Sequence, residues 1–194
     1  MQLKDETKAR ELLVEYGLKL QSEGLVQGTW GNLSILLDDE YMICTPSGRD
    51  YNHLTPDDMV KVHLDTLEYD GEIKPTSEKI FHARIYREHP DAGAIVHTHS
   101  TYSCVYATVG SSMRITDKDS ISKIGRHINC AQYASPGTKK LCDNILTALK
   151  GNTKGCFMSH HGMVCYGENM EGAFDNALLI ERTATDIIED LWKD

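Results

Sequence analysis

The sequence predicts an α/β fold in which helices are layered on a sheet within one domain, residues 1–194. Three observations lead to this prediction. Short apolar runs with the pattern of strands alternate with amphipathic segments of helical period. No internal repeat, linker or low-complexity segment interrupts them. A length of 194 residues also suits a single hydrophobic core.

One helix and three strands are predicted in the first third of the chain. Residues 4–22 place apolar side chains on one helical face, and Gly24 follows as a suitable stop. The apolar runs at 32–37 and 40–46 are separated by acidic residues and predict a β-hairpin or two adjacent strands. Residues 59–65 alternate apolar and polar side chains and predict a third strand.

A helix, a strand and a second helix are predicted next. Residues 74–90 begin with a proline and two hydroxyl residues that can cap a helix, and end before a second proline. The nearly fully apolar run at 93–99 predicts a short strand. Residues 100–110 predict a helix that ends at a glycine.

In the last third of the chain, the sequence pattern predicts helices and strands clearly toward the C-terminus but not at the start. Residues 111–130 have a mixed pattern that predicts no particular element. Residues 138–150 predict a helix, and 155–167 predict two short strands that meet near Gly162. Residues 169–192 predict a long terminal helix.

Composition and charge exclude several classes of protein. The formal net charge of −9, without clustered Lys and Arg, argues against a nucleic-acid partner. No apolar stretch approaches the roughly 20 residues that span a bilayer, so we expect no membrane segment. The charged, amphipathic N-terminus lacks the features of a signal peptide, and we expect a cytoplasmic protein. Six cysteines without a C-x-x-C pair predict reduced, mostly buried thiols.

The stretch "HTH" carries His97 and His99 at the end of a predicted strand. Residues two apart in a strand point to the same face, so both imidazoles suit one metal ion, while Thr98 faces away. The pair alone also fits a structural or surface role. The stretch "SHHGMV" adds His160 and His161 at another strand end. Three histidines that leave a coordination position open are typical of a catalytic metal site.

Glu78 lies near the start of the predicted helix at 74–90, which leads directly into the strand of His97. The helix dipole alone favours an acid at such a position. Near a metal, the carboxylate is suited to bind the ion without substrate and to act as a base once substrate displaces it.

Three turns are rich in glycine and hydroxyl residues: 27–34, 45–50 and 74–78. Each alone is an ordinary turn. Near a histidine cluster, the three together would form an uncharged cradle of N–H and O–H donors for a phosphate group.

Five motifs in order carry a family resemblance: "GTWGNLSI", "TPSG", "KPTSEKIFH", "AIVHTHS" and "HHGMVCYGEN". From about residue 8 to 190 the sequence resembles the class II aldolase/adducin family, and within it the zinc-dependent sugar-phosphate aldolases of the L-fuculose-phosphate type. The resemblance implies a single-domain three-layer α/β/α sandwich with a central, mainly antiparallel sheet flanked by helices. It also implies a homotetramer with sites at subunit interfaces.

The resemblance assigns roles to particular residues. It implies a zinc ion, replaceable by Mn²⁺ or Co²⁺, that is held by His97, His99 and His161, with His160 facing elsewhere. Glu78 is implied as the catalytic acid and as a fourth ligand without substrate. The implied phosphate contacts are Thr29, Asn32, Ser47, Gly48, Thr76 and Ser77.

Glu78 also favours one activity within the family. Related 4-epimerases of pentulose phosphates have aspartate at this position, and the related dehydratases have no acid there. We therefore expect reversible cleavage of a ketose 1-phosphate to dihydroxyacetone phosphate and an aldehyde, with an epimerase or dehydratase as the alternative. A non-catalytic adducin-like interaction module is a further alternative, which the metal histidines argue against.

Two departures from the aldolase pattern concern the aldehyde end of the substrate. The resemblance implies a proton-transferring tyrosine in the loop at 112–127, but this loop has none, and an ungapped comparison puts Lys118 there. The resemblance also implies a C-terminal tail whose tyrosine closes the site, and we expect this tail to be missing because the sequence ends at Asp194.

Overall fold

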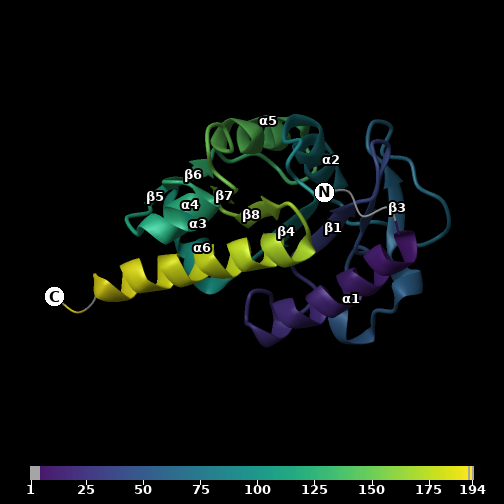
Figure 1. Ribbon diagram of the computed structural model, residues 1–194, viewed down its shortest axis with the longest axis horizontal. Helices are drawn as coiled ribbons and strands as arrows, with labels where there is room; N and C mark the ends of the chain where they lie inside the picture. The colour runs from purple at the N-terminus through teal and green to yellow at the C-terminus, as the bar shows by residue number, and fades with distance from the viewer. Residues whose placement is uncertain (1–4, 192, 194) are drawn as a thin grey trace.

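The computed structural model describes residues 5–191 and 193, and in this part of the chain eight strands form one sheet with helices on both faces (Figure 1). The strand order is β3-β2-β1-β4-β8-β7-β6-β5. Only β6 and β7 pair in parallel among the described strands. The strands are β1 (Asn32–Leu36), β2 (Tyr41–Cys44), β3 (Val60–His63), β4 (Ala94–Thr98), β5 (Met113–Arg114), β6 (His127–Ala131), β7 (Gly155–Met158) and β8 (Gly162–Gly167).

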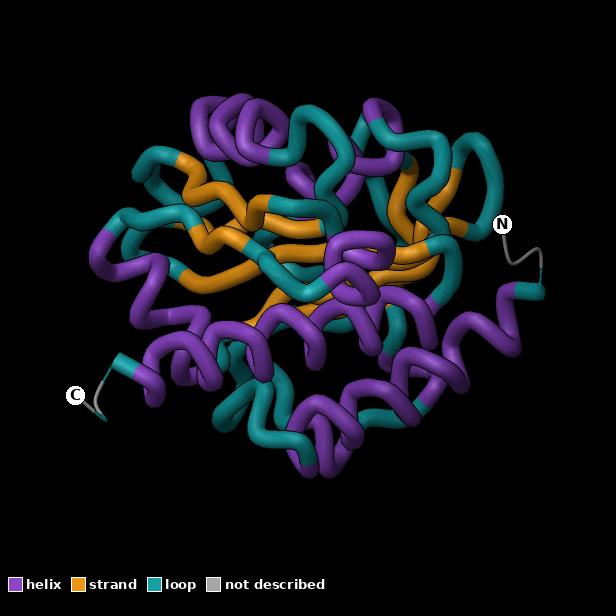
Figure 2. Tube along the Cα trace, turned by 60° about the vertical axis from the view of Figure 1, so that its left-hand side comes forward, coloured by secondary structure: helices purple, strands orange, loops and turns teal. Residues whose placement is uncertain are grey.

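Helices cover both faces of this sheet, as Figure 2 shows by the purple segments on either side of the orange strands. One hydrophobic cluster joins α1, α3, α4 and α6 to one face, and a second joins α2 and α5 to the other. The three-layer, mainly antiparallel fold predicted from the family resemblance is therefore confirmed. The helices are α1 (Glu6–Ser22), α2 (Lys79–Glu88), α3 (Thr101–Val109), α4 (Lys118–Ile124), α5 (Lys139–Ala148) and α6 (Met170–Asp190).

The helices and strands predicted from periodicity are confirmed, with small shifts at their ends. The helix predicted at 74–90 begins at Lys79, because Pro46 and Pro75 form an isolated β-bridge that keeps the preceding residues extended. The predicted helix ends at residues 4 and 192 lie outside the described residues. Among the described helices, none is both long and apolar enough to cross a bilayer.

The alternation of side chains across the sheet places the polar residues of β1 and β4. Ile95 packs in the cluster under α2 and α5, whereas Val96 packs in the cluster on the opposite face. Because side chains alternate along a strand, His97 points toward the layer of α2 and α5. Asn32 and Ser34 of β1 alternate in the same way with Leu33, which belongs to the opposite cluster. One end of the sheet therefore presents polar side chains to α2.

Candidate metal centre

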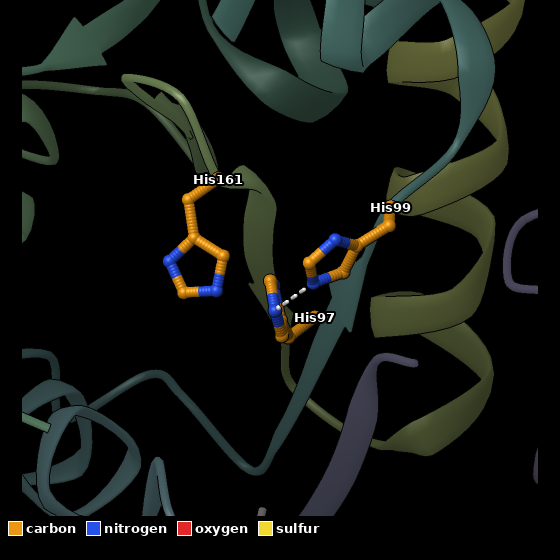
Figure 3. Close-up of side chains that lie close together, drawn as sticks. All are labelled: His97, His99 and His161. Carbon is orange, nitrogen blue, oxygen red and sulfur yellow. Dashed lines mark hydrogen bonds between the residues drawn. The ribbon is translucent and has the colours of Figure 1, made fainter. Parts of the chain in front are cut away.

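Three histidines converge at one end of the sheet (Figure 3). His97, His99 and His161 each offer one ring nitrogen, and these atoms all lie within 4.8 Å of one another. Nε2 of His97 lies 3.0 Å from Nε2 of His99. The sequence predicted these three side chains as a group, and the structure brings them together.

The sheet register and one glycine set this convergence. In the register, His97 lies opposite Asn32 of β1 and opposite Val164 of β8. His161 lies in the turn between β7 and β8, just before Gly162. A Cβ atom at Gly162 would lie 2.4 Å from the carbonyl oxygen of Thr98, closer than such atoms approach. Glycine here lets the turn pack against β4, which places His161 beside His97.

His160 faces away from the cluster, as the resemblance implied. Its φ of 55° is in the left-handed region, and its side chain is exposed. Its ring lies 6.0 Å from the ring of Tyr133, and its backbone N–H donates to the carbonyl of Ala107. The left-handed backbone at His160 directs the imidazoles of His160 and His161 to different surroundings.

The Glu78 carboxylate is the acid beside this cluster. Its Oε2 lies 3.1 Å from Nε2 of His97, and its Oε1 lies 3.0 Å from Nε2 of His161. The side-chain amide of Asn32 donates to Oε2 at 2.8 Å. Burial raises the pKa of Glu78, but the His97 and His161 imidazoles lower it by more, so its pKa lies well below the usual value. Glu78 is an anion held against two imidazoles.

The nitrogen atoms of the cluster fit a metal ion. His97 donates its Nδ1–H to the carbonyl of Met163 at 2.8 Å, which leaves Nε2 as the ring nitrogen that a metal ion in the cluster would use. Burial, together with His97 and His161, lowers the pKa of His99 to about 3, which keeps that ring neutral. Three imidazole nitrogens beside a carboxylate match the donor set of catalytic metal sites rather than the closed, cysteine-rich set of structural zinc.

A pocket of about 220 Å³ opens beside the histidines. All six residues predicted to contact phosphate line it, together with Glu78, His99 and His161. Ser47 donates its backbone N–H to Lys74, and Thr76 donates its own to Thr45, so the second and third predicted turns are joined. None of the lining residues, all within the described part of the chain, is Lys or Arg. An anion in this pocket would meet N–H and O–H groups.

The six predicted phosphate contacts differ in their exposure. Thr29, Ser47, Gly48 and Ser77 are exposed and free to face a ligand. Asn32 and Thr76 are buried and already engaged, because Asn32 donates to Glu78 and the hydroxyl of Thr76 accepts the backbone N–H of Glu78 at 3.2 Å. Both residues therefore contact the acid directly, which the sequence did not reveal.

Sequence reasoning assigned no role to several residues at this site. Trp30 and Pro136 also line the pocket, and the Trp30 ring, 61% exposed, lies 5.6 Å from the ring of His99. His82 is fully buried and bonded to Asn32. Its position four residues after Glu78, one helical turn away, is the signal in the sequence that would have indicated it.

A larger cleft of about 690 Å³ lies along the edge strand β3. It shares no lining residue with the histidine pocket, and many of its lining residues are acidic: Glu6, Asp57, Glu68, Asp70 and Glu72. We assign the functional site to the smaller pocket because the chemistry of its residues is that of a metal and anion site.

Fold and site define the class of the protein: an α/β sandwich with a three-histidine candidate metal centre and an acid beside an uncharged pocket. Residues 11–187 match the family described as class II aldolase and adducin N-terminal domain. The chain belongs to this family.

Similar proteins of this family include sugar-phosphate enzymes. The chain is 36% identical to 5-deoxy-D-ribulose 1-phosphate aldolase from Bacillus thuringiensis serovar kurstaki over 90% of this chain and 81% of the relative. It is 33% identical to 3-oxo-tetronate 4-phosphate decarboxylase from Pectobacterium atrosepticum over 94% and 84%, respectively. A solved structure of L-fuculose 1-phosphate aldolase superposes with a TM-score of 0.87 and 31% identity over 96% of this chain and 86% of that one.

Proposed function

We propose that this protein is a metal-dependent lyase that cleaves a ketose 1-phosphate reversibly to dihydroxyacetone phosphate and an aldehyde. One observation carries the proposal. The anionic Glu78 lies 3.0 to 3.1 Å from two imidazoles of a three-histidine cluster, beside a pocket of hydroxyl and N–H groups. A metal site, an acid and an anion pocket are what an aldol cleavage of this type requires.

His97, His99 and His161 would hold the metal, which we propose to be zinc, with Mn²⁺ or Co²⁺ as substitutes that accept the same donors. When bound, the metal would supply a Lewis acid toward the substrate carbonyl. The Nδ1–H bond from His97 to Met163 fixes the orientation of that ring, so His97 presents Nε2 without rearrangement.

Glu78 would exchange the proton at the carbon that forms the new bond. In the synthetic direction its carboxylate takes a proton from the hydroxymethyl carbon of dihydroxyacetone phosphate, and in the cleavage direction it returns that proton. The low pKa of Glu78 keeps it ionised before substrate arrives, as a base requires. We expect substrate to displace the carboxylate from His97 and His161.

The hydroxyl pocket would hold the phosphate group. Thr29, Ser47 and Ser77 offer exposed hydroxyl groups, and the backbone at Gly48 is open, with nothing within 4 Å of a Cβ atom there. Neutral donors bind phosphate without Lys or Arg. Anchoring the phosphate orients the reacting carbons over Glu78 and the histidines.

The names of the relatives suggest the substrate class. The relatives include aldolases named for 5-deoxyribulose 1-phosphate and for L-fuculose phosphate. Both substrates end in a deoxy carbon, so we propose L-fuculose 1-phosphate or a related deoxy-ketose 1-phosphate as the substrate. On family resemblance we also propose a cytoplasmic homotetramer with sites at subunit interfaces.

One relative supports a second candidate reaction. The 33% identity to a 3-oxo-tetronate 4-phosphate decarboxylase favours a decarboxylation, which also breaks a carbon–carbon bond near a carbonyl group. Loss of CO₂ from such a substrate would also leave dihydroxyacetone phosphate, so the other product, CO₂ or an aldehyde, distinguishes the two reactions.

The experiment is a substrate panel with the zinc-loaded protein. Fuculose, rhamnulose, ribulose and 5-deoxyribulose 1-phosphates are each incubated with and without chelator, and dihydroxyacetone phosphate is followed by a coupled assay. We expect release with at least one deoxy sugar, abolished by chelator and restored by zinc. No release across the panel would contradict the proposal and favour the decarboxylase, epimerase or dehydratase reactions.

A further inference from the structure

A buried chain of hydrogen bonds runs away from Glu78 between β1 and α2. Asn32 donates its Nδ2–H to Oε2 of Glu78 at 2.8 Å, and its Oδ1 lies 2.6 Å from Nε2 of His82. Nδ1 of His82 lies 2.7 Å from the hydroxyl of Ser34, which lies 2.8 Å from the hydroxyl of Tyr86. This series of hydrogen bonds therefore links Glu78 to three residues that lie outside the pocket: His82, Ser34 and Tyr86.

All five members of this chain are buried. The exposed fractions of Ser34 and His82 are 0%, and those of Asn32, Glu78 and Tyr86 are 5 to 6%. The His82 ring also stacks on Phe81, with centroids 4.7 Å apart and 21° between the planes. Polar groups buried this deeply are fixed by their partners, because an unmade bond leaves them without water as a substitute.

The donor and the acceptor of each hydrogen bond in this series can be assigned by starting at the Glu78 carboxylate. As a carboxylate, Glu78 only accepts, so the amide nitrogen of Asn32 faces it and Oδ1 faces His82. Oδ1 also only accepts, so Nε2 of His82 carries the proton. Burial lowers the pKa of His82 to about 3, so the ring is neutral and its Nδ1 accepts from Ser34. The hydroxyl of Ser34 then accepts from Tyr86.

This arrangement distinguishes the two oxygen atoms of Glu78. Oε2 is held by Asn32, whereas Oε1, within the described residues, has no well-oriented hydrogen bond and faces His161. A bond at one oxygen fixes the carboxylate plane and leaves the other oxygen for proton exchange. If the Asn32 amide rotated by half a turn, its oxygen would face the carboxylate and repel it.

We propose that His82 is a positioning residue for the proton transfer: its Nε2–H fixes the Asn32 amide, which holds Oε2 of Glu78 and leaves Oε1 to exchange the proton. The inference rests on the proposed function, since it concerns the acid of that reaction. His82 itself touches neither the pocket nor the histidine cluster, so a purely structural role would change stability without changing the proton transfer.

The first test measures deuterium exchange at the hydroxymethyl carbon of dihydroxyacetone phosphate by zinc-loaded protein in D₂O, a partial reaction that needs no aldehyde. His82→Leu removes the donor. We expect its exchange rate to fall about 10- to 100-fold while the KM for dihydroxyacetone phosphate changes by less than about 3-fold. His82→Gln offers a side-chain N–H near the position of Nε2, and we expect it to recover most of the rate.

Control variants separate this effect from damage to the fold. His89→Leu makes the same substitution at the other end of α2, where His89 bonds to Tyr166 at 3.1 Å, and we expect wild-type exchange. If His82→Leu fails to fold, Ser34→Ala is measured in its place. This substitution removes the hydroxyl that donates to Nδ1 of His82, so the ring is free to take the other tautomer. Wild-type exchange rates in His82→Leu or Ser34→Ala would overturn the proposal.

A second readout does not depend on activity. Nitrogen NMR of the protein, with and without zinc, assigns the tautomer of His82. We expect a proton on Nε2 and none on Nδ1. A proton on Nδ1 would overturn the inference whatever the exchange rates are. If the wild-type protein exchanges no deuterium, the proposed function is contradicted, and the tautomer alone then decides the arrangement around His82.

Discussion

The two adjacent histidines of the turn between β7 and β8 offer a matched pair of substitutions. His161 faces His97 and Glu78, whereas His160 is exposed and turned away. We expect His161→Ala to lose bound zinc on dialysis, because one of three nitrogen donors is removed, and His160→Ala to keep one zinc per chain. Metal analysis of the dialysed proteins checks this. Equal zinc contents in the two variants would contradict the assignment of His161.

His82 predicts a pH dependence of stability. Burial lowers the pKa of His82 from 6.5 to about 3. Between these two pH values the unfolded chain therefore binds a proton at His82 that the folded chain does not. The contribution of neutral His82 to the free energy of unfolding is therefore complete above pH 6.5. As the pH falls from 6.5 toward 3, the free energy of unfolding decreases by about 1.4 kcal/mol per pH unit.

The comparison of wild type with His82→Gln isolates this contribution. The free energy of unfolding, measured in urea from pH 7 downward, should fall less steeply in the variant, because glutamine does not titrate. Parallel pH curves for the two proteins would show that His82 is not buried as a neutral ring.

At the scale of elements, α6 holds the segment that follows His99. The carboxylate of Glu181 accepts hydrogen bonds from the hydroxyl of Ser100, from the backbone of Tyr102, and from both the backbone and the hydroxyl of Ser103, at 2.6 to 2.9 Å. These donors lie at the start of α3, where backbone N–H groups have no partner within the helix. Glu181 thus caps α3 from another helix and fixes the end of β4.

The prediction for this contact is a loss of stability. Glu181→Gln places an amide N–H against donors and should lower the free energy of unfolding by about 1 to 3 kcal/mol. Glu189→Gln, an exposed position on the same helix bonded to the Tyr102 hydroxyl, should change it by less than about 0.5 kcal/mol. Urea unfolding measures both. Equal effects would mean that the cap does not hold α3.

Elements with a clear period could be predicted from the sequence, and short ones could not. The unassigned stretch 111–130 contains β5 with 2 residues, α4 with 7 residues and most of β6, which are too short to show a helical or strand period. The order of the strands was also beyond local patterns, because β4 pairs with β1 and β8, far from it in sequence.

The candidate site also contains residues that local motifs predict and residues that only the folded structure brings together. The motifs named the three histidines, Glu78 and the pocket residues, because each motif is local. His82 was missed because its partners Asn32 and Ser34 lie 50 and 48 residues away on β1. Asn32 was assigned to phosphate on resemblance, and only the packing of β1 against α2 shows that its side chain is engaged by Glu78 and His82.

At the scale of the whole molecule, the metal would connect distant parts of the chain. The histidines come from the end of β4 and from the turn after β7, and Glu78 precedes α2. Since an ion bound only by the folded state stabilises it, zinc at 100 times its Kd should add about 2.7 kcal/mol to the free energy of unfolding. Thermal unfolding with zinc and with chelator tests this, and an unchanged Tm would argue against a metal in this site.

The most direct test of the central claim is the turnover and zinc content of Glu78→Gln. We predict that this variant keeps one zinc per chain but loses about 10²- to 10⁴-fold in the rate of dihydroxyacetone phosphate release, because glutamine cannot exchange the proton. His97→Ala, assayed beside it, should lose both zinc and turnover. Near wild-type turnover in Glu78→Gln, or full zinc and full activity in His97→Ala, would contradict the account.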